Sequence, residues 1–381
     1  MDKRTQALYL LAAARNFQPR HHDLLVSQLG SLEAVFDVAE DEWLKLDLPA
    51  GHKQRLRDAL AGCDPAAELS KLAGQGITAV GWGSEGYPHL LARLPDAPLM
   101  LFCRGEPGLM RHEGIGIVGS RKCSERGREL AKRFGRELAE AGVPVISGMA
   151  LGIDGAAHTG ALEARGPTVA VLGCGVDVVY PPRHNELYEQ LCREALVLSE
   201  YLPGTAPLKE HFPQRNRIIA GLARGTLVVE APMGSGALIT ARLAIDQGRE
   251  VFALPGPVGS PYTRGTHDLI KRGQAKLVEN VDDILVEYGA TRASLRRERT
   301  TQPRLPLNEQ PAAMGASTAA DAVPTDGGAA RLLEALSYEG THVNDLVRKL
   351  GISTGECIAQ LTLLEIKGLV SASGNGYYVR L

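Results

Sequence analysis

The sequence has no hydrophobic run long enough to cross a bilayer. Its longest apolar runs, "PVISGMALGI" and "TVAVLG", are far shorter than the roughly 20 residues that a membrane-spanning helix needs. The N-terminus, "MDKRTQALYLLAAARNF", has too short an apolar stretch and too early an arginine for a secretory signal. We therefore expect a soluble cytoplasmic protein without a membrane partner.

The sequence also lacks closely spaced cysteines. It has six cysteines, which lie far apart and form no C-x-x-C pair. This spacing indicates neither a disulfide framework nor a zinc site. The cysteines are expected to be small buried hydrophobic residues, and neither a metal nor another cofactor is expected.

An excess of charge of one sign is absent as well. The formal net charge of 381 residues is −2, so bulk charge gives no argument for nucleic acid, and any such argument depends on local clusters. The hydrophobic fraction of 44% is ample for a buried core. A chain of this length is expected to form two or three domains.

Two common signatures of enzymes are missing. No G-x-x-x-x-G-K-[ST] string occurs, which excludes a Walker loop. The stretch "PMGSGAL" has Met233 where a G-x-S-x-G elbow requires glycine. Asp154 and His158 lie one helical turn apart, but no serine at a fixed offset completes a triad. We expect these two residues to brace a loop.

A literal G-x-G-x-x-G occurs at Gly114, Gly116 and Gly119. In a dinucleotide fingerprint the glycines follow a strand and open a helix, because the backbone turns tightly against a pyrophosphate. Here Gly114 directly precedes the apolar run "IGIVG" and Gly116 lies inside it, and this run is itself a predicted strand. Only Gly119 is at the turn, so the context argues against a dinucleotide.

The pattern of apolar residues changes near residue 77. Residues 1–76 contain short amphipathic helices and are predicted to form a small helical domain. Residues 77–290 alternate apolar strands with helices. The strands are expected at 115–120, 144–148, 168–173, 196–200, 226–231 and 250–256, and the helices at 124–141, 153–165, 184–195, 213–224 and 235–247. This alternation predicts an α/β fold with a Rossmann-like, doubly wound parallel sheet.

The C-terminal part is expected to be separate. Residues 291–328 are rich in proline, alanine and polar residues without periodicity, which predicts a flexible linker. Residues 329–381 follow the order of a winged helix, with a hairpin turn at Asn375 and Gly376. Between residues 327 and 381, five basic residues balance five acidic residues. Since groove binding favours positive charge, a protein contact or weak DNA contact is expected there.

In an open parallel sheet, ligands bind beyond the carboxyl ends of the strands. Several loops at that edge are glycine-rich and lead into helix N-termini, which favour anions. The cations in these loops suit an extended polyanion better than a single nucleotide. The alternative is that the glycines are ordinary turn residues and that the arginines merely cover the surface. These cations are Arg121, Lys122, Lys209, Arg215 and Arg217.

An aromatic residue accompanies the cations. Phe212 lies between Lys209 and Arg215 in "KEHFPQRNR", at the expected ligand edge of the sheet. Unstacked bases bind to aromatic rings flanked by cations. Because a duplex offers no exposed base face, this pattern favours single strands. The alternative is a core phenylalanine that packs the following helix.

Several segments together resemble the DNA-processing protein A family (DprA/Smf). They include "IGIVGSR", "VISGMALGIDGAAHTGAL", "TVAVLGCGVDVVYPPRHNEL", "HFPQRNRIIAGLA" and "VVEAPMGSGALITARLA", and they cover about residues 80–290. The resemblance implies a protein of natural transformation that binds incoming single-stranded DNA, protects it and helps load RecA recombinase, without catalytic turnover. It also implies that the N-terminal helices form a sterile-alpha-motif-like, helix-hairpin-helix-related domain.

The loops and the resemblance together give the candidate site. The expected contacts with single-stranded DNA are Gly119, Ser120, Arg121, Lys122, Ser147, Gly148, Met149, Ala150, Gly152, Lys209, Phe212, Arg215, Asn216, Arg217, Gly234 and Ser235. The resemblance further implies that homodimer formation and RecA contact involve His267, Leu269, Ile270 and Leu277.

Two other functions stay open at this point. One is a Rossmann-like nucleotide-binding enzyme related to nucleoside phosphate hydrolases, which needs a closed pocket and an acid that activates water. Glu230, at the end of the predicted strand 226–231, is the obvious candidate for that acid. The other is a scaffold whose winged helix recruits partners.

Overall fold

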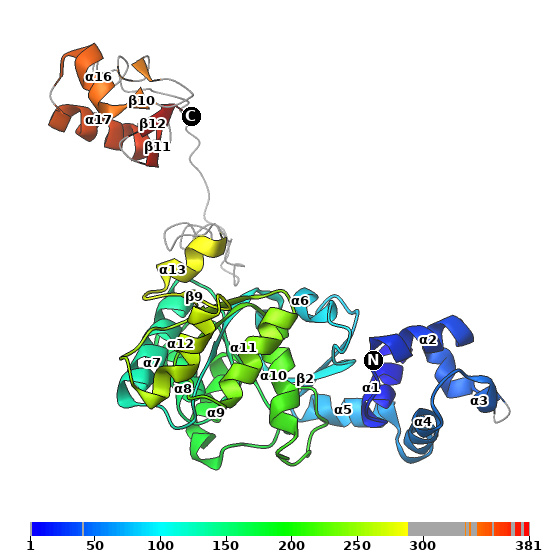
Figure 1. Ribbon diagram of the computed structural model, residues 1–381. Helices are drawn as coiled ribbons and strands as arrows, with labels where there is room; N and C mark the ends of the chain where they lie inside the picture. Colours follow the sequence, from blue (N-terminus) through cyan, green and yellow to red (C-terminus); the bar gives the residue numbers. More distant parts are fainter. Residues whose placement is uncertain are drawn as a thin grey trace, which may run out of the picture. The chain divides into compact units, whose positions relative to one another are not determined.

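The computed structural model describes residues 2–39, 42–288, 332, 335–336, 341–352, 354–366, 370–374 and 377–380. The chain divides into two compact units, Met1–Arg304 and Leu305–Leu381 (Figure 1). The expected linker at 291–328 and the expected turn at Asn375 and Gly376 lie outside the described residues. Within the described residues, no helix has the length and hydrophobicity that crossing a membrane would require.

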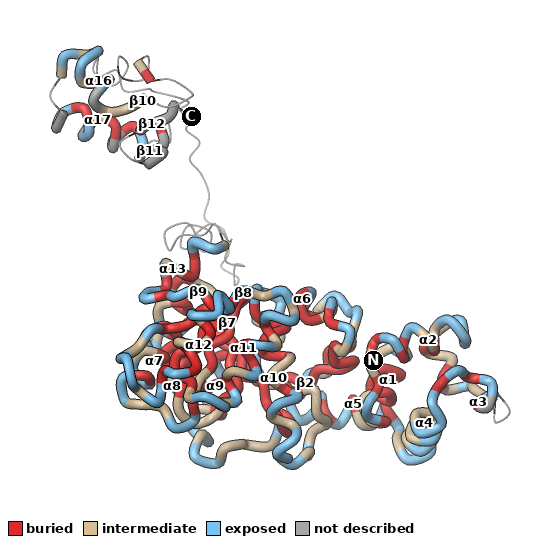
Figure 2. The backbone as a smooth tube through the Cα atoms, viewed as in Figure 1, coloured by how far each residue is buried: buried red, intermediate tan, exposed pale blue. Residues whose placement is uncertain are grey.

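Six parallel strands form the centre of the first unit, as the sequence predicts. They lie in the order β6-β5-β4-β3-β7-β8. From β3 the chain adds β4, β5 and β6 on one side, and it then returns to add β7 and β8 on the other side of β3. Residues of these strands are almost all buried (Figure 2), because helices cover both faces. The strands are β3 (Gly114–Val118), β4 (Val145–Ser147), β5 (Thr168–Val171), β6 (Leu196–Ser199), β7 (Ala223–Val228) and β8 (Glu250–Ala253).

Three further strands extend this sheet. β2 (Met100–Gly105) pairs antiparallel with β6, and β1 (Thr78–Gly81) pairs antiparallel with β2. At the opposite edge, β9 (Lys276–Leu277) pairs parallel with β8. The strand expected at 226–231 begins earlier, at Ala223, because the preceding helix runs into β7 without a loop.

The expected helices are confirmed. α7 (Glu125–Glu140) and α8 (Ile153–Glu163) pack closely against each other, and glycine permits this contact. A Cβ atom on Gly135 would lie 2.3 Å from the carbonyl oxygen of Ala157. The other helices of the first unit's α/β part are α6 (His89–Ala92), α9 (Asn185–Glu194), α10 (His211–Leu222), α11 (Gly236–Asp246), α12 (Arg264–Lys271) and α13 (Asp282–Leu285).

The N-terminal helices share a hydrophobic core with the sheet. Leu8 and Tyr9 of α1 are buried in the same cluster as Phe102 of β2, and the Tyr9 and Phe102 rings meet edge to face at 6.1 Å. Arg4 also donates a hydrogen bond to the carbonyl oxygen of Trp82. These helices therefore pack as part of the first unit. They are α1 (Lys3–Ala13), α2 (Pro19–Leu29), α3 (Glu42–Lys45), α4 (Ala50–Gly62) and α5 (Pro65–Gly74).

The second unit has its own core and small sheet. The strand order is β10-β12-β11, with both pairs antiparallel. Leu346, Cys357, Leu361 and Val370 lie in one buried cluster. The described elements are β10 (Thr341–His342), α16 (Val343–Leu350), α17 (Thr354–Ile366), β11 (Val370–Gly374) and β12 (Tyr377–Arg380).

Candidate nucleic-acid interface

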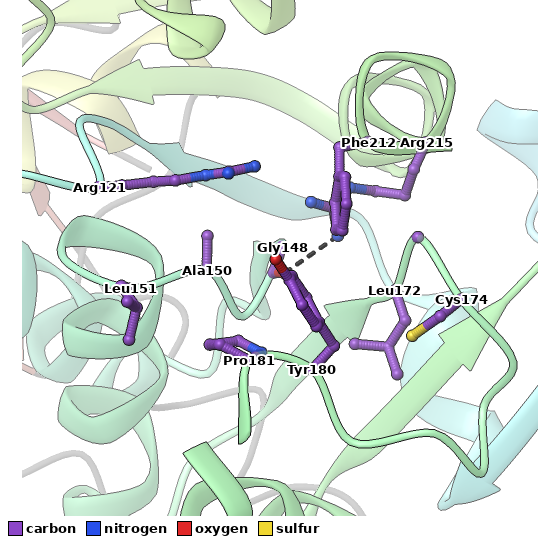
Figure 3. A pocket seen from close by; sticks show the side chains of 11 residues that line it. Arg121, Gly148, Ala150, Leu151, Leu172, Cys174, Tyr180, Pro181, Phe212 and Arg215 are labelled. Carbon is purple, nitrogen blue, oxygen red and sulfur yellow. Dashed lines mark hydrogen bonds between the residues drawn. The ribbon is translucent and has the colours of Figure 1, made fainter. Parts of the chain in front are cut away.

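Loops from four parts of the chain meet at the carboxyl edge of the sheet and line one pocket (Figure 3). The pocket lies beside β3, next to the point where the strand order reverses, which is where ligands bind in open α/β sheets. Its lining residues are Arg121, Gly148, Ala150, Leu151, Leu172, Gly173, Cys174, Tyr180, Pro181, Phe212 and Arg215.

Two aromatic rings form adjoining walls of this pocket. Phe212 is in the first turn of α10, and its ring centre lies 5.2 Å from that of Tyr180. The Phe212 ring also touches the backbone at Gly173, where a Cβ atom would approach to 3.0 Å. Both rings are half-buried and face the cavity. Phe212 is thus held by packing while one side of the ring borders open space.

One exposed cation, Arg121, lies over the pocket. Arg121 extends over the cavity toward Phe212, and its guanidinium carbon lies 5.3 Å from the ring centre. Arg121, Lys122 and Lys209 are all exposed. The buried Ser120 supports this loop, since its hydroxyl accepts a hydrogen bond from the Lys122 N–H at 3.1 Å.

The loop between β4 and α8 forms another side of the pocket. Met149 is buried and has a φ of +54°, and Gly152 has a φ of +82°, both in the left-handed region that costs energy for most residues. α8 begins after Gly152 without a side-chain cap. The Ile153 N–H instead donates to the Ser120 carbonyl at 3.4 Å and the Gly155 N–H to the Ala150 carbonyl at 3.0 Å, so these N–H groups already have acceptors. Ser147 instead donates its hydroxyl to the Ile117 carbonyl inside the sheet.

Arg215 lies at the inner end of the pocket, where it is only 3% exposed. Its Nη1 donates to the carbonyl oxygens of Gly148, at 3.0 Å, and Val171. Burial lowers the pKa of Arg215 to about 10, which leaves it charged at neutral pH, and the nearby Asp154 carboxylate opposes the shift. Arg215 therefore ties the β4–α8 loop to the end of β5.

Arg217 and Asn216 make contacts within the fold. Arg217 Nη2 lies 2.6 Å from Glu200 Oε2, and its Nε lies 3.2 Å from Asp96 Oδ2. The Asn216 side chain accepts a hydrogen bond from Arg215 Nε at 3.4 Å. Neither residue lines the pocket, and the Arg217 charge already has two carboxylate partners.

Other expected site residues surround the pocket without lining it. Gly234 is exposed, and Ser235 caps α11 by accepting a hydrogen bond from the Ala237 N–H at 3.3 Å. Gly119 packs against Ile153, where a Cβ atom would approach to 2.4 Å. Sequence reasoning missed Tyr180 and the other lining residues of the loop after β5, although the proline-rich "YPPRHN" marks that loop as ordered.

The acidic and histidine candidates for catalysis have structural contacts. Both carboxylate oxygens of Glu230 accept hydrogen bonds from Ser124, one from its N–H at 2.8 Å and one from its hydroxyl at 2.6 Å. Asp154 accepts a hydrogen bond from the Gly148 N–H at 3.2 Å. In the part of the chain that the structure describes, no three His, Cys, Asp or Glu side chains are grouped to hold a metal ion.

His158 is fully buried behind the same loop. Its Nδ1 pairs with the Thr168 hydroxyl at 2.8 Å, and that hydroxyl donates to the Val145 carbonyl, so Nδ1 carries the hydrogen. Burial lowers the pKa of His158 to about 3, which keeps the ring neutral. Asp154 and His158 thus brace the loop, as the sequence predicts.

The residues expected for dimer and RecA contacts do not share one exposed face. Leu269 is 7% exposed and packs in the core between α11, α12 and the sheet. His267 Nε2 accepts a hydrogen bond from the Gly256 N–H at 3.2 Å, and Ile270 is half-buried. Leu277 alone is largely open, at 45% exposed, on the edge strand β9.

Comparison with known proteins assigns the family. Residues 78–289 match the model for DNA recombination-mediator protein A, and residues 316–376 match the model for the DprA winged helix domain. DNA processing protein DprA of Streptococcus pneumoniae is 46% identical over 202 residues, which cover 53% of this chain and 71% of the relative. Protein Smf of Escherichia coli is 40% identical over 307 residues, covering 78% of this chain and 76% of the relative.

Solved structures agree with this family assignment. The crystal structure of S. pneumoniae DprA has a TM-score of 0.64 at 37% identity, covering 74% of this chain and 97% of that protein. DNA processing protein A of Helicobacter pylori, whose structure was solved to explain its binding mode for single-stranded DNA, has a TM-score of 0.51 at 28% identity. The match covers 58% of this chain and 96% of that protein. The matched domains, the sheet and the winged helix together show that this chain belongs to the DprA family of DNA recombination-mediator proteins.

Proposed function

We propose that this chain binds single-stranded DNA at the pocket beside β3. The observation that carries the proposal is a pocket lined by the aromatic rings of Phe212 and Tyr180, with the exposed Arg121 over it. One base stacks against Phe212 and Tyr180 inside the pocket. The neighbouring phosphates bind the exposed Arg121, Lys122 and Lys209.

This combination favours single strands over duplexes. A base in a duplex is stacked on both faces, so it cannot enter a pocket between aromatic rings. The cations, by contrast, would bind either form, because phosphate contacts carry no information on strand number. The single-stranded DNA of the H. pylori relative supports the same assignment.

The proposed role is that of a binder without catalytic turnover. Glu230, the acid that a nucleotide-hydrolysing enzyme would use, has both oxygens committed to Ser124 at the start of α7. As a member of the DprA family, the chain is proposed to act in the cytoplasm during natural transformation. There, as a homodimer, it protects incoming single-stranded DNA and passes it to RecA.

Titration with oligonucleotides of increasing length, and with mononucleotides, at two salt concentrations tests this function. We expect affinity to increase strongly from a mononucleotide to an oligonucleotide and to fall as salt increases, because each phosphate contact releases counterions. Tight binding of a mononucleotide with no gain from length would favour the nucleotide-binding enzyme and overturn the proposal.

A further inference from the structure

We propose that Arg215 reads the edge of the base in this pocket, so that the pocket favours a base with a carbonyl oxygen over adenine. This inference rests on the proposed binding of single-stranded DNA. It concerns which base enters, whereas stacking on Phe212 and contacts with phosphate act on every base alike.

The donor groups of Arg215 are only partly used. Nη1 donates to Gly148 and Val171, and Nε donates to Asn216. Among the residues that the structure describes, the hydrogen bonds given for Arg215 involve Nη1 and Nε and not Nη2. Because the side chain is 3% exposed and that part borders the pocket, Arg215 offers N–H donors to a molecule inside it (Figure 3).

Glycine at position 148 leaves this donor uncovered. A Cβ atom on Gly148 would lie 2.5 Å from Arg215 Nη2 and 2.8 Å from Asp154 Oδ2. Any larger residue at this position would therefore lie against Nη2. The glycine of "SGMALG" at position 148 thus leaves the approach to the guanidinium open. The Gly148 carbonyl at the same time accepts a hydrogen bond from Nη1 and holds it in place.

Charge at the inner end of the pocket favours a neutral ligand group. Asp154 also lies beside Gly148 and is buried, so its carboxylate offsets the positive charge of Arg215. A phosphate placed there would lose its hydration without meeting a net positive charge. A carbonyl oxygen costs less to desolvate and needs only one donor, which Arg215 supplies. Phosphates instead bind the exposed Arg121, Lys122 and Lys209.

The chemistry of the bases then sets the preference. Thymine, cytosine and guanine each have an exocyclic carbonyl oxygen, whereas adenine has an amino group and no carbonyl. An adenine amino group facing Arg215 would place donor against donor. We expect a single thymine to bind about tenfold more tightly than a single adenine, within the usual range for base discrimination by arginine.

Oligonucleotides with only one base test this without altering the protein. The probe is an abasic backbone with thymine, adenine or 2,4-difluorotoluene at its centre, the last having the shape of thymine without carbonyl oxygens. We expect the full-length chain to bind the thymine probe about tenfold better than the other two. Equal binding of all three would overturn this inference alone. Failure of unmodified oligo(dT) to bind would overturn the proposed function as well.

A protein variant gives a second measurement. Gly148→Ala places a methyl group against Nη2, so we expect it to lose the difference between thymine and adenine probes while still binding the abasic backbone. Gly236→Ala is the matched control, because a Cβ atom there meets nothing within 4 Å. If Gly148→Ala keeps the thymine preference, the inference is wrong. The base-analogue comparison decides the question if that variant does not fold.

Discussion

The Arg121 guanidinium lies over the Phe212 ring, with its carbon 5.3 Å from the ring centre. A cation from the loop after β3 and an aromatic ring from the first turn of α10, far apart in the sequence, thus border the same cavity. In the proposed binding mode, this pairing puts a phosphate contact beside a base-stacking surface. The two residues have separable roles, which the first two predictions address.

Replacing Arg121 or Lys209 with Ala should lower affinity for all sequences alike. Each change should also reduce the slope of log affinity against log salt by about 0.7, the value for one phosphate contact on a single strand.

Arg217→Ala is the contrasting variant, because Arg217 is paired with Glu200 and Asp96. It should leave the salt slope unchanged and lower the free energy of unfolding by about 3 kcal/mol, through the unpaired buried charge. A smaller salt slope in Arg217→Ala would contradict this assignment.

Phe212→Ala should weaken binding by about 1 to 3 kcal/mol through lost base stacking. The salt slope should not change, since stacking releases no counterions. Binding isotherms at several salt concentrations and a thermal unfolding curve check both statements. Normal affinity combined with a lower melting temperature would mean that the ring only packs against Tyr180 and Gly173.

Substitutions at the proposed dimer residues should fall into two classes. Leu277→Arg adds a charge to an exposed position on β9, so it should disrupt a dimer and leave the monomer folded. Leu269→Arg puts the charge in the core, where burial costs several kcal/mol, and should unfold the chain. Sedimentation together with circular dichroism distinguishes these results. An unchanged mass for a folded Leu277→Arg dimer would place the interface elsewhere.

Acid should destabilise the protein partly through His158. Its pKa is lowered to about 3 in the folded chain, so between pH 6.5 and 3 the unfolded chain binds a proton that the folded chain does not. Stability is therefore lost as pH falls, by up to about 1.4 kcal/mol per pH unit from this group. His158→Phe should flatten the stability curve in this window, measured by urea unfolding. Parallel curves for the two proteins would show that His158 does not titrate there.

Deleting the second unit, residues 305–381, should leave affinity for single-stranded DNA unchanged within about twofold, because every proposed phosphate contact is in the first unit. Deleting residues 1–79 should instead lower stability, since Leu8 and Tyr9 of α1 belong to the same core as Phe102. Filter binding and thermal unfolding measure the two effects. Loss of most affinity without the second unit would assign DNA contacts to the winged helix.

The sequence alone predicted the central sheet and the edge at which the pocket lies. Apolar runs separated by amphipathic helices are local patterns, and parallel strands bring their carboxyl ends to one edge, so Arg121, Gly148 and Phe212 could be placed there in advance. The short strands β1, β2 and β9 were not predicted. They depend on pairing with edges of a sheet that exists only after folding.

Only the tertiary structure decided which cations remain free. Arg215 and Arg217 are two residues apart on α10, yet one holds the β4–α8 loop and the other pairs with Glu200 and Asp96. It also brought Tyr180, from the loop after β5, against Phe212. Burial and ion pairing depend on groups distant in the sequence, which no local pattern records. The sequence therefore identified the edge of the sheet where the pocket lies, and three-dimensional packing separated the exposed side chains from those that hold the fold.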